Sequence, residues 1–322
     1  RTRPVLAGAT IPVTQGAQEI RAGRGIRCGP HCIANAGGVI CAAMEDPGAS
    51  EGAVLQSIEE KLRRNTRLEL EDTVKRNILP RESGGIPLDE LGGPGWGLSL
   101  VSDVALDYCV FDLNKARFVV QGFGAVGRHT ARFLTAKGAV LVGAADSGGT
   151  IHNPDGLDVA RLSEIKQSGG SLIEYTDAEH LDRDAVVDIE CDIWIPAARP
   201  DVIHENNVHR LRTRLVIEGA NIPVTQGAEE TLAGRGILCV PDFIANAGGV
   251  ICAAMEYHGA SEGAVLQTIE EKLRRNTRLV LEDAVKRNIL PREASMQLAL
   301  ARVRKAMSFR RYSLFSTAPG FV

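Results

Sequence analysis

Residues 117–127 read RFVVQGFGAVG, an apolar strand pattern that runs directly into three spaced glycines. A helical pattern continues to about Lys137, and the apolar segment 139–145 predicts a second strand. A G-x-G-x-x-G turn between a strand and a helix is typical of dinucleotide binding, because its bare backbone can approach a pyrophosphate at the helix N-terminus. The alternative is a tight strand–helix turn that binds no ligand. The candidate phosphate-binding residues are Gly122, Phe123, Gly124, Ala125, Val126 and Gly127.

Asp146 follows the second predicted strand, 19 residues after Gly127. A carboxylate at this place accepts hydrogen bonds from a ribose hydroxyl of the dinucleotide, and it disfavours the 2′-phosphate that distinguishes NADP from NAD. The sequence therefore predicts NAD as the cofactor. Arg128 and Lys137 lie nearby in the sequence, so NADP stays open as an alternative.

Strand and helix patterns alternate along the rest of this region. Apolar runs at 192–197, 215–218 and 237–240 are separated by short helical patterns, and residues 262–288 follow helical spacing. The segment 148–170 predicts a hairpin followed by a helix. Strands that alternate with helices form parallel sheets with right-handed crossovers. The expected fold class is therefore α/β, with a doubly wound Rossmann-like parallel sheet.

The composition excludes several other classes of protein. Of 322 residues, 44% are apolar and 24% are charged, which suits a chain of about two globular domains. A net charge of -3 provides no basic surface for nucleic acid, and no apolar run reaches the roughly 20 residues that span a bilayer. No signal-peptide pattern follows Arg1, so a cytoplasmic protein is expected. Cys28, His31 and Cys32 have no second cluster at zinc-site spacing, so no metal is expected.

The chain repeats part of itself. Residues 8–82 align with 219–293 at a constant offset of 211 without a gap, and 62 of the 75 pairs are identical. Leu238 of the second copy, in a predicted strand, is replaced by Arg27 in the first. A strand in the middle of a parallel sheet is nearly all apolar. The second copy is therefore expected to be the working one.

The expected domains follow from this repeat. Residues 1–83 form a duplicated partial copy of the cofactor domain, residues 84–295 form the Rossmann dinucleotide-binding domain, and residues 296–322 form a C-terminal helix and tail. The sheet has one place for the repeated segment, so the spare copy must pack elsewhere or exchange into a second molecule. A homo-oligomer, including a domain-swapped dimer, is therefore expected.

Five short motifs together resemble the cofactor domain of the glutamate, leucine, phenylalanine and valine dehydrogenases. They appear in the order of that family, and the segment GGIPLDELG at 84–92 is similar to its glutamate branch. The resemblance implies an NAD(P)-dependent oxidative deamination of L-glutamate or a similar amino acid to the 2-oxo acid. The motifs are GFGAVG at 122–127, ADS at 145–147, CDIWIPAA at 191–198, EGAN at 218–221 and IANAGGV at 244–250.

The resemblance also implies roles for individual residues. Asn221 and Asn246 would lie beside the nicotinamide ribose and carboxamide, and Ala197 and Ala198 would line the adenosine side of the site. Val250 would face the side chain of the amino-acid substrate. The alternatives are that Asn246 caps the glycine pair after it and that Val250 is an ordinary core residue.

The catalytic lysine and aspartate of the family were not identified. Members of the family carry them in a substrate domain that precedes the cofactor domain, whereas residues 1–83 hold the repeated segment instead. Lys61 and Lys75 lie in charged helical patterns that are typical of solvated surface. No catalytic residue is assigned, and little or no turnover is expected. The alternatives are a non-catalytic dinucleotide-binding module and a rearranged fragment without a selected function.

Overall fold

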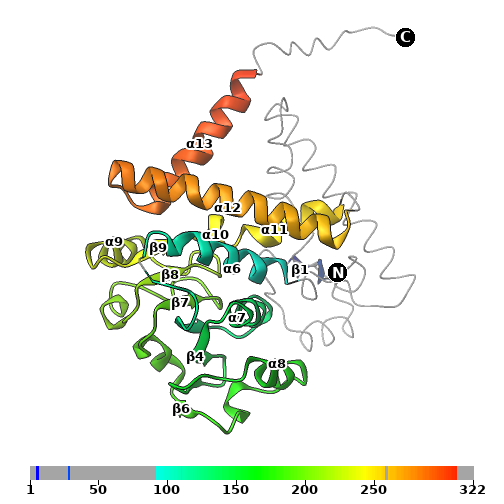
Figure 1. Cartoon of the computed structure of the whole chain (residues 1–322), viewed down its shortest axis with the longest axis vertical. Helices are drawn as coiled ribbons and strands as arrows, with labels where there is room; N and C mark the ends of the chain where they lie inside the picture. The colour runs from blue at the N-terminus through cyan, green and yellow to red at the C-terminus, as the bar shows by residue number, and fades with distance from the viewer. Residues whose placement is uncertain (1–4, 7–27, 30–91, 110, 258–259, 310–322) are drawn as a thin grey trace. The chain divides into compact units, whose positions relative to one another are not determined.

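The computed structural model describes residues 5–6, 28–29, 92–109, 111–257 and 260–309 (Figure 1). They fall into two compact units, and the larger one, Leu88–Cys252 with Ala260–Gln297, contains the main sheet. Within the described residues, none of the helices combines the length and the hydrophobicity needed to cross a lipid bilayer.

The main sheet has seven strands in the order β6-β5-β4-β3-β7-β8-β9. The strands are β3 (Arg117–Gln121), β4 (Val140–Ala145), β5 (Thr150–His152), β6 (Glu179–Leu181), β7 (Ile193–Pro196), β8 (Leu215–Ile217) and β9 (Leu238–Val240). Five are parallel, while β5 pairs antiparallel with β4 and β6 pairs antiparallel with β5. The turn at 146–149 between β4 and β5 is too short for a crossover, so β5 must reverse direction. The expected α/β fold with a mainly parallel sheet is confirmed.

The strand order creates a topological switch point between β3 and β7. From β3 the chain moves outward through β4, β5 and β6, and it then returns to the other side of β3 with β7. The connections that follow these two adjacent strands therefore lead in opposite directions, and in open α/β sheets ligands bind at the carboxyl ends of such strands. The glycine-rich turn follows β3 directly, so the fold places it at this point.

Both faces of the five parallel strands are largely buried, as a parallel sheet requires. The helices are α6 (Gly93–Leu106), α7 (Ala125–Ala136), α8 (Val159–Gln167), α9 (Gln226–Gly234), α10 (Asp242–Ala245), α11 (Ala247–Tyr257), α12 (Glu262–Arg287) and α13 (Pro291–Phe309), with 3-10 segments η2 (Leu172–Glu174), η3 (Arg183–Asp188) and η4 (Val208–Arg210). On one face, Val119, Trp194 and Val216 pack with residues of α9, η3 and η4. Helix α6 contacts β8, and helix α7 contacts β3 and β4. Helix α6 also lies along α12 (Figure 1).

Polar side chains cap the N-termini of α8, α9 and α12. Asp158 accepts hydrogen bonds from the first-turn amides of α8, and Thr225 and Ser261 accept one each at the starts of α9 and α12. Asn288 ends α12 in the left-handed region at a φ of 53°, which asparagine tolerates. Helix α7 has Gly124 as its N-cap and, like α6 and α10, has no side chain that caps its first turn.

The second copy of the repeat supplies one strand of the main sheet, β9, which pairs with β8 just before the repeat begins. In the pairing of β8 with β9, Val216 lies opposite Cys239. At the first copy, β1 (Val5–Leu6), just before the repeat, and β2 (Cys28–Gly29), within it, form a parallel pair in which Val5 lies opposite Cys28. Both positions differ by 211 from their counterparts, so the two strand pairs share one register. The remainder of the first copy lies outside the described residues.

At two fully packed positions, the first copy carries a charged residue where the second copy has an apolar one. Leu232 is 0% exposed and Val280 is 1% exposed. The first copy carries Arg21 and Glu69 at the equivalent positions. A charged side chain without a partner is strongly destabilising in such surroundings. The first copy is therefore physically unsuited to the place that the second copy occupies.

Candidate functional site

Close packing explains two of the three motif glycines. Gly122 adopts a φ of 99°, and a Cβ atom there would lie 2.6 Å from the Cβ of Ala198, at the end of β7. A Cβ atom on Gly127 would lie 2.0 Å from the backbone oxygen of Gly122. The amides of Gly122 and Phe123 both donate to the backbone oxygen of Ala145. These contacts hold the turn between β3, β4 and β7.

The remaining glycine leaves room for a ligand. Gly124 is exposed, and a Cβ atom built on it meets nothing within 4 Å. The amides of the first helical turn, which includes Ala125 and Val126, have no acceptors within the helix, and they carry the positive end of its dipole. No acidic residue lies in this turn to compete for them. The buried ring of Phe123 anchors the turn. This arrangement fits a pyrophosphate, because bare amides and a helix N-terminus bind anions.

Asp146 already has a full set of hydrogen-bond donors. Its Oδ2 accepts from Lys166 Nζ at 2.7 Å and from the amide of Leu172 at 3.0 Å. Its Oδ1 accepts from the amide of Gly148 and the hydroxyl of Ser171. Burial alone would raise the pKa of this carboxyl, but these donors, Lys166 foremost, hold its pKa below the ordinary value. The carboxylate for which the sequence predicts ribose binding orders the turn after β4.

The carboxyl ends of β7 and β8 are joined by hydrogen bonds. The amide of Ala197 donates to the backbone oxygen of Gln121, at the end of β3. The amides of Gly219 and Ala220 both donate to the backbone oxygen of Pro196. Because parallel strands end at the same edge, the turns that follow β3, β4, β7, β8 and β9 lie along one side of the sheet.

The predicted nicotinamide-side residues lie on the turns that follow β8 and β9. Asn221 is exposed, and Asn246 is half-buried at the C-terminal end of α10. Val250, on α11, is 40% exposed, so it is not a core residue. Lys61 and Lys75 lie outside the described residues. The described structure thus brings the candidate cofactor residues to one sheet edge.

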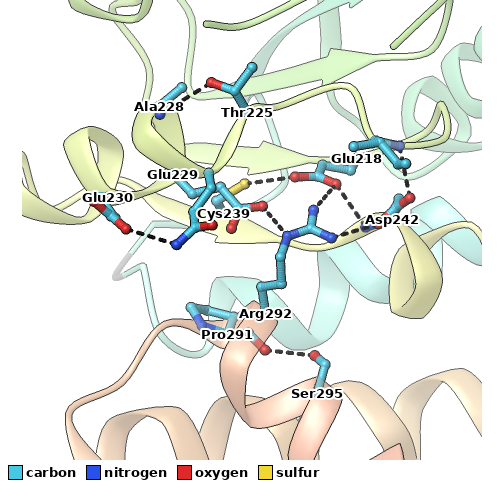
Figure 2. Close-up of polar contacts among 12 residues, drawn as sticks. Glu218, Thr225, Ala228, Glu229, Glu230, Cys239, Asp242, Pro291, Arg292 and Ser295 are labelled. Atoms are coloured by element: carbon cyan, nitrogen blue, oxygen red, sulfur yellow. Dashed lines mark hydrogen bonds and ion pairs between the residues drawn. The ribbon is translucent and has the colours of Figure 1, made fainter. Parts of the chain in front are cut away.

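Sequence reasoning missed a buried ionic cluster beside the Asn221 turn. The guanidinium of Arg292, at the start of α13, contacts Glu218, Glu229 and Asp242 (Figure 2). The exposed fractions of the carboxylate side chains are 0%, 4% and 10%. One signal was available in the repeat, because all three acids are lost together in the first copy. Their replacements there are Ala7, Gln18 and His31.

This cluster is an ion pair network and not a metal centre. Among the described residues, Glu218, Glu229 and Cys239 place potential ligand atoms within 4.8 Å of one another. Arg292 already binds both carboxylates, and Glu218 further accepts from the amide of Asp242 and the thiol of Cys239. A cation would have to displace the guanidinium, because the carboxylate oxygens that could bind a metal already accept hydrogen bonds from Arg292.

The cluster predicts an unusual pH dependence of stability. Burial raises the pKa of Glu218 from 4.5 to about 8; Arg292 opposes this rise, and Glu229 and Asp242 add to it. Between these two values the folded state keeps a proton that the unfolded state has lost. The contribution of Glu218 to stability therefore falls as the pH rises through this window.

We expect Glu218→Gln, which keeps a neutral side chain at every pH, to reduce this loss. Melting temperatures at pH 5 and pH 8 should show a smaller decrease for the variant, by several degrees, since ~1 kcal/mol shifts the melting temperature of a domain this size by about 2–4 °C. The exposed Glu230→Gln is the control and should keep the parent's decrease. Identical decreases in parent and Glu218→Gln would contradict the assigned protonation.

A glycine-rich turn at the switch point of a doubly wound, mainly parallel sheet defines the class, an α/β protein with a Rossmann-type fold. The chain belongs to the Glutamate/Leucine/Phenylalanine/Valine dehydrogenase family, which it matches over residues 1–77 and 84–311. The family expectation from the sequence motifs is confirmed.

Two curated relatives show what share of a glutamate dehydrogenase chain the similarity covers. The NADP-specific glutamate dehydrogenase of Saccharolobus shibatae is 35% identical over 239 residues, which cover 72% of this chain and 56% of that protein. The NAD-specific glutamate dehydrogenase of Staphylococcus aureus (strain COL) is 34% identical over 207 residues, which cover 62% of this chain and 50% of that protein. The chain thus spans about half the length of the curated relatives it matches.

Solved structures show the same fold. The hetero-hexameric glutamate dehydrogenase from Thermus thermophilus, in its Leu-bound form, aligns with a TM-score of 0.64 and 26% identity, over 80% of this chain and 62% of that chain. The L-tryptophan dehydrogenase from Nostoc punctiforme aligns with a TM-score of 0.55 and 21% identity, over 68% of this chain and 61% of that chain. The second likeness concerns the fold alone.

Proposed function

We propose that this chain binds a nicotinamide dinucleotide along the carboxyl edge of its sheet. The first-turn amides of α7 would hold the pyrophosphate, and the observation that carries this proposal is the open space beside Gly124. Asp146 would lie at the adenosine ribose, with Ala197 and Ala198 on the adenosine side. The nicotinamide half would lie toward the turns that carry Asn221 and Asn246.

We infer that NAD is bound and that NADP is also accommodated. Asp146 disfavours a 2′-phosphate when its charge is unopposed. Here the ammonium of Lys166 lies 2.7 Å from the carboxylate, so the local charge is compensated. The relatives include both an NADP-specific and an NAD-specific glutamate dehydrogenase. Discrimination between the two dinucleotides should therefore be weak.

We propose that the associated chemistry is the oxidative deamination of L-glutamate or a similar amino acid. A bound nicotinamide would accept a hydride from the α-carbon of the substrate. The amides of Asn221 and Asn246 would orient the ring, and the exposed side chain of Val250 would face the substrate. Ala253 on α11 offers no hydroxyl to bind the side-chain carboxylate of glutamate. Amino acids similar to glutamate are therefore included among the proposed substrates.

We further propose that this chain alone turns over little or no substrate. Correct orientation of the substrate can lower the activation barrier by about 7–11 kcal/mol, and a positioned acid or base raises the rate roughly 10²–10⁴-fold. Residues 1–83 provide a second copy of the cofactor-domain segment where the family has its lysine and aspartate. A non-catalytic role within a hetero-oligomer is the second candidate, since the Thermus thermophilus relative is described as hetero-hexameric.

Titration with reduced dinucleotides tests this proposal directly. We expect a saturable change in the fluorescence of both NADH and NADPH when the full chain is added. Adding glutamate with NAD should then produce no rise in the absorbance of reduced nicotinamide. The absence of saturable binding would refute the dinucleotide site, and steady production of NADH would refute the proposed loss of activity.

A further inference from the structure

Arg292 connects the start of α13 to three separate elements of the sheet edge. Its Nη2 donates to Glu218, just after β8, at 2.7 Å, and its Nη1 donates to Asp242, just after β9, at 3.1 Å. Its Nε donates to Glu229 on α9. Figure 2 shows the guanidinium between these carboxylates. A planar guanidinium with donors in several directions can satisfy three acceptors at once, which an ammonium on a flexible stem cannot do with the same geometry.

The turn beside this cluster holds a strained residue. Ile222 adopts a φ of 49°, a conformation that is a genuine outlier for a β-branched side chain. It also precedes Pro223, which further restricts its backbone. Its side chain is 59% exposed, so packing does not hold it in place. Other contacts must stabilise this conformation.

Two hydrogen bonds supply that stabilisation. The amide of Ile222 donates to Oδ2 of Asp242 at 2.8 Å, and its backbone oxygen accepts from the amide of Asp201 at 2.9 Å. Oδ1 of Asp242 accepts from Arg292. The same carboxylate thus joins the guanidinium to the strained amide, and Asn221 is the residue immediately before Ile222.

We propose that Arg292 is a positioning residue that holds the turn 218–222 in the form that receives the nicotinamide half of the dinucleotide, an inference that rests on the proposed function. The guanidinium acts through Asp242 and does not itself touch the ligand. The adenosine half depends instead on Gly124 and Asp146, and the hydrogen bonds of Asp146 go to the segment 148–172, outside this cluster. Loss of Arg292 should therefore weaken one half of the site selectively.

The test compares NADH with ADP, which lacks the nicotinamide and its ribose, by calorimetry on the full chain. Arg292→Lys should weaken NADH binding by about 5- to 100-fold. Without the guanidinium, the backbone strain at Ile222 is no longer supported, and it lowers the population of the binding-competent turn by about that factor. ADP binding should stay unchanged. Arg287→Lys, on the last turn of α12, is the matched control and should leave both affinities unchanged, since that side chain is partly exposed with exposed ion-pair partners.

A rescue variant separates positioning from general stability. Asparagine tolerates positive φ far better than isoleucine. Adding Ile222→Asn to Arg292→Lys should therefore restore most of the NADH affinity. If Arg292→Lys does not fold, Asp242→Asn provides the same test, because asparagine has one acceptor oxygen and cannot accept from Arg292 and from the amide of Ile222 at the same time.

The outcomes distinguish this inference from the proposed function. A parent protein that binds neither ADP nor NADH would refute the dinucleotide site itself. If the parent binds both, equal weakening of the two ligands in the folded variant, or no weakening of NADH, would overturn the positioning role. Selective loss of NADH affinity followed by rescue would support it.

Discussion

The variant Leu232→Arg should unfold at a much lower urea concentration than the parent. This substitution places in the second copy the residue that the first copy carries at position 21. Leu232 is fully buried on α9 among apolar neighbours that include Val224 and Ala228. An arginine there removes apolar burial and introduces a charge without a free partner, which costs about 4 kcal/mol or more. Domains of this kind have only about 5–15 kcal/mol of stability, so the loss is a large fraction.

Thr268→Ser is the matched control, because it also transfers a residue from the first copy. The hydroxyl of Thr268 donates to the backbone oxygen of Ala264 at 2.8 Å, and serine can make the same bond. Its free energy of unfolding should change by about 0.5 kcal/mol or less. Leu232→Met, which conserves volume, should lose less than about 1.5 kcal/mol. A midpoint for Leu232→Arg equal to that of the parent would contradict the burial of this position.

Most strands of the sheet could be predicted from the sequence because each coincides with a short apolar run. The run RFVVQ before the glycines, and the apolar runs that become β4, β7, β8 and β9, all lie within about two residues of their predicted positions. Buried parallel strands need continuous apolar residues, so the pattern and the structure share one cause. The antiparallel pairing of β6 with β5 was not predicted, because residues 179–181 are mostly polar and partly exposed.

The candidate site could be predicted only where its chemistry depends on short segments. The glycine turn has a fixed spacing, and its packing contacts follow from that spacing. The contacts of Arg292 join residues 50–74 positions apart, and no local pattern encodes them. The four donors to Asp146 likewise come from the segment 148–172, which sequence spacing does not place around a carboxylate.

Gly124→Ala should abolish most dinucleotide binding while leaving the fold intact. The backbone of Gly124 is extended, at a φ of -79°, so alanine fits without strain, and its Cβ atom would project into open space. That space is where the proposed pyrophosphate lies. A methyl group that removes even one hydrogen bond to a charged phosphate costs about 1.5–3 kcal/mol, which is roughly a 10- to 100-fold loss of affinity. Calorimetry with NADH measures this loss.

Gly124 is the discriminating position because the other two motif glycines cannot be changed without disturbing the turn. A Cβ atom on Gly127 would collide with the backbone oxygen of Gly122, so lost binding there could reflect lost structure. Gly263→Ala is the matched control, since its Cβ atom also meets nothing within 4 Å and it lies in α12. Both variants should unfold within about 1 kcal/mol of the parent. If Gly124→Ala then binds NADH as tightly as Gly263→Ala does, the pyrophosphate does not lie at the N-terminus of α7, and the proposed site is wrong.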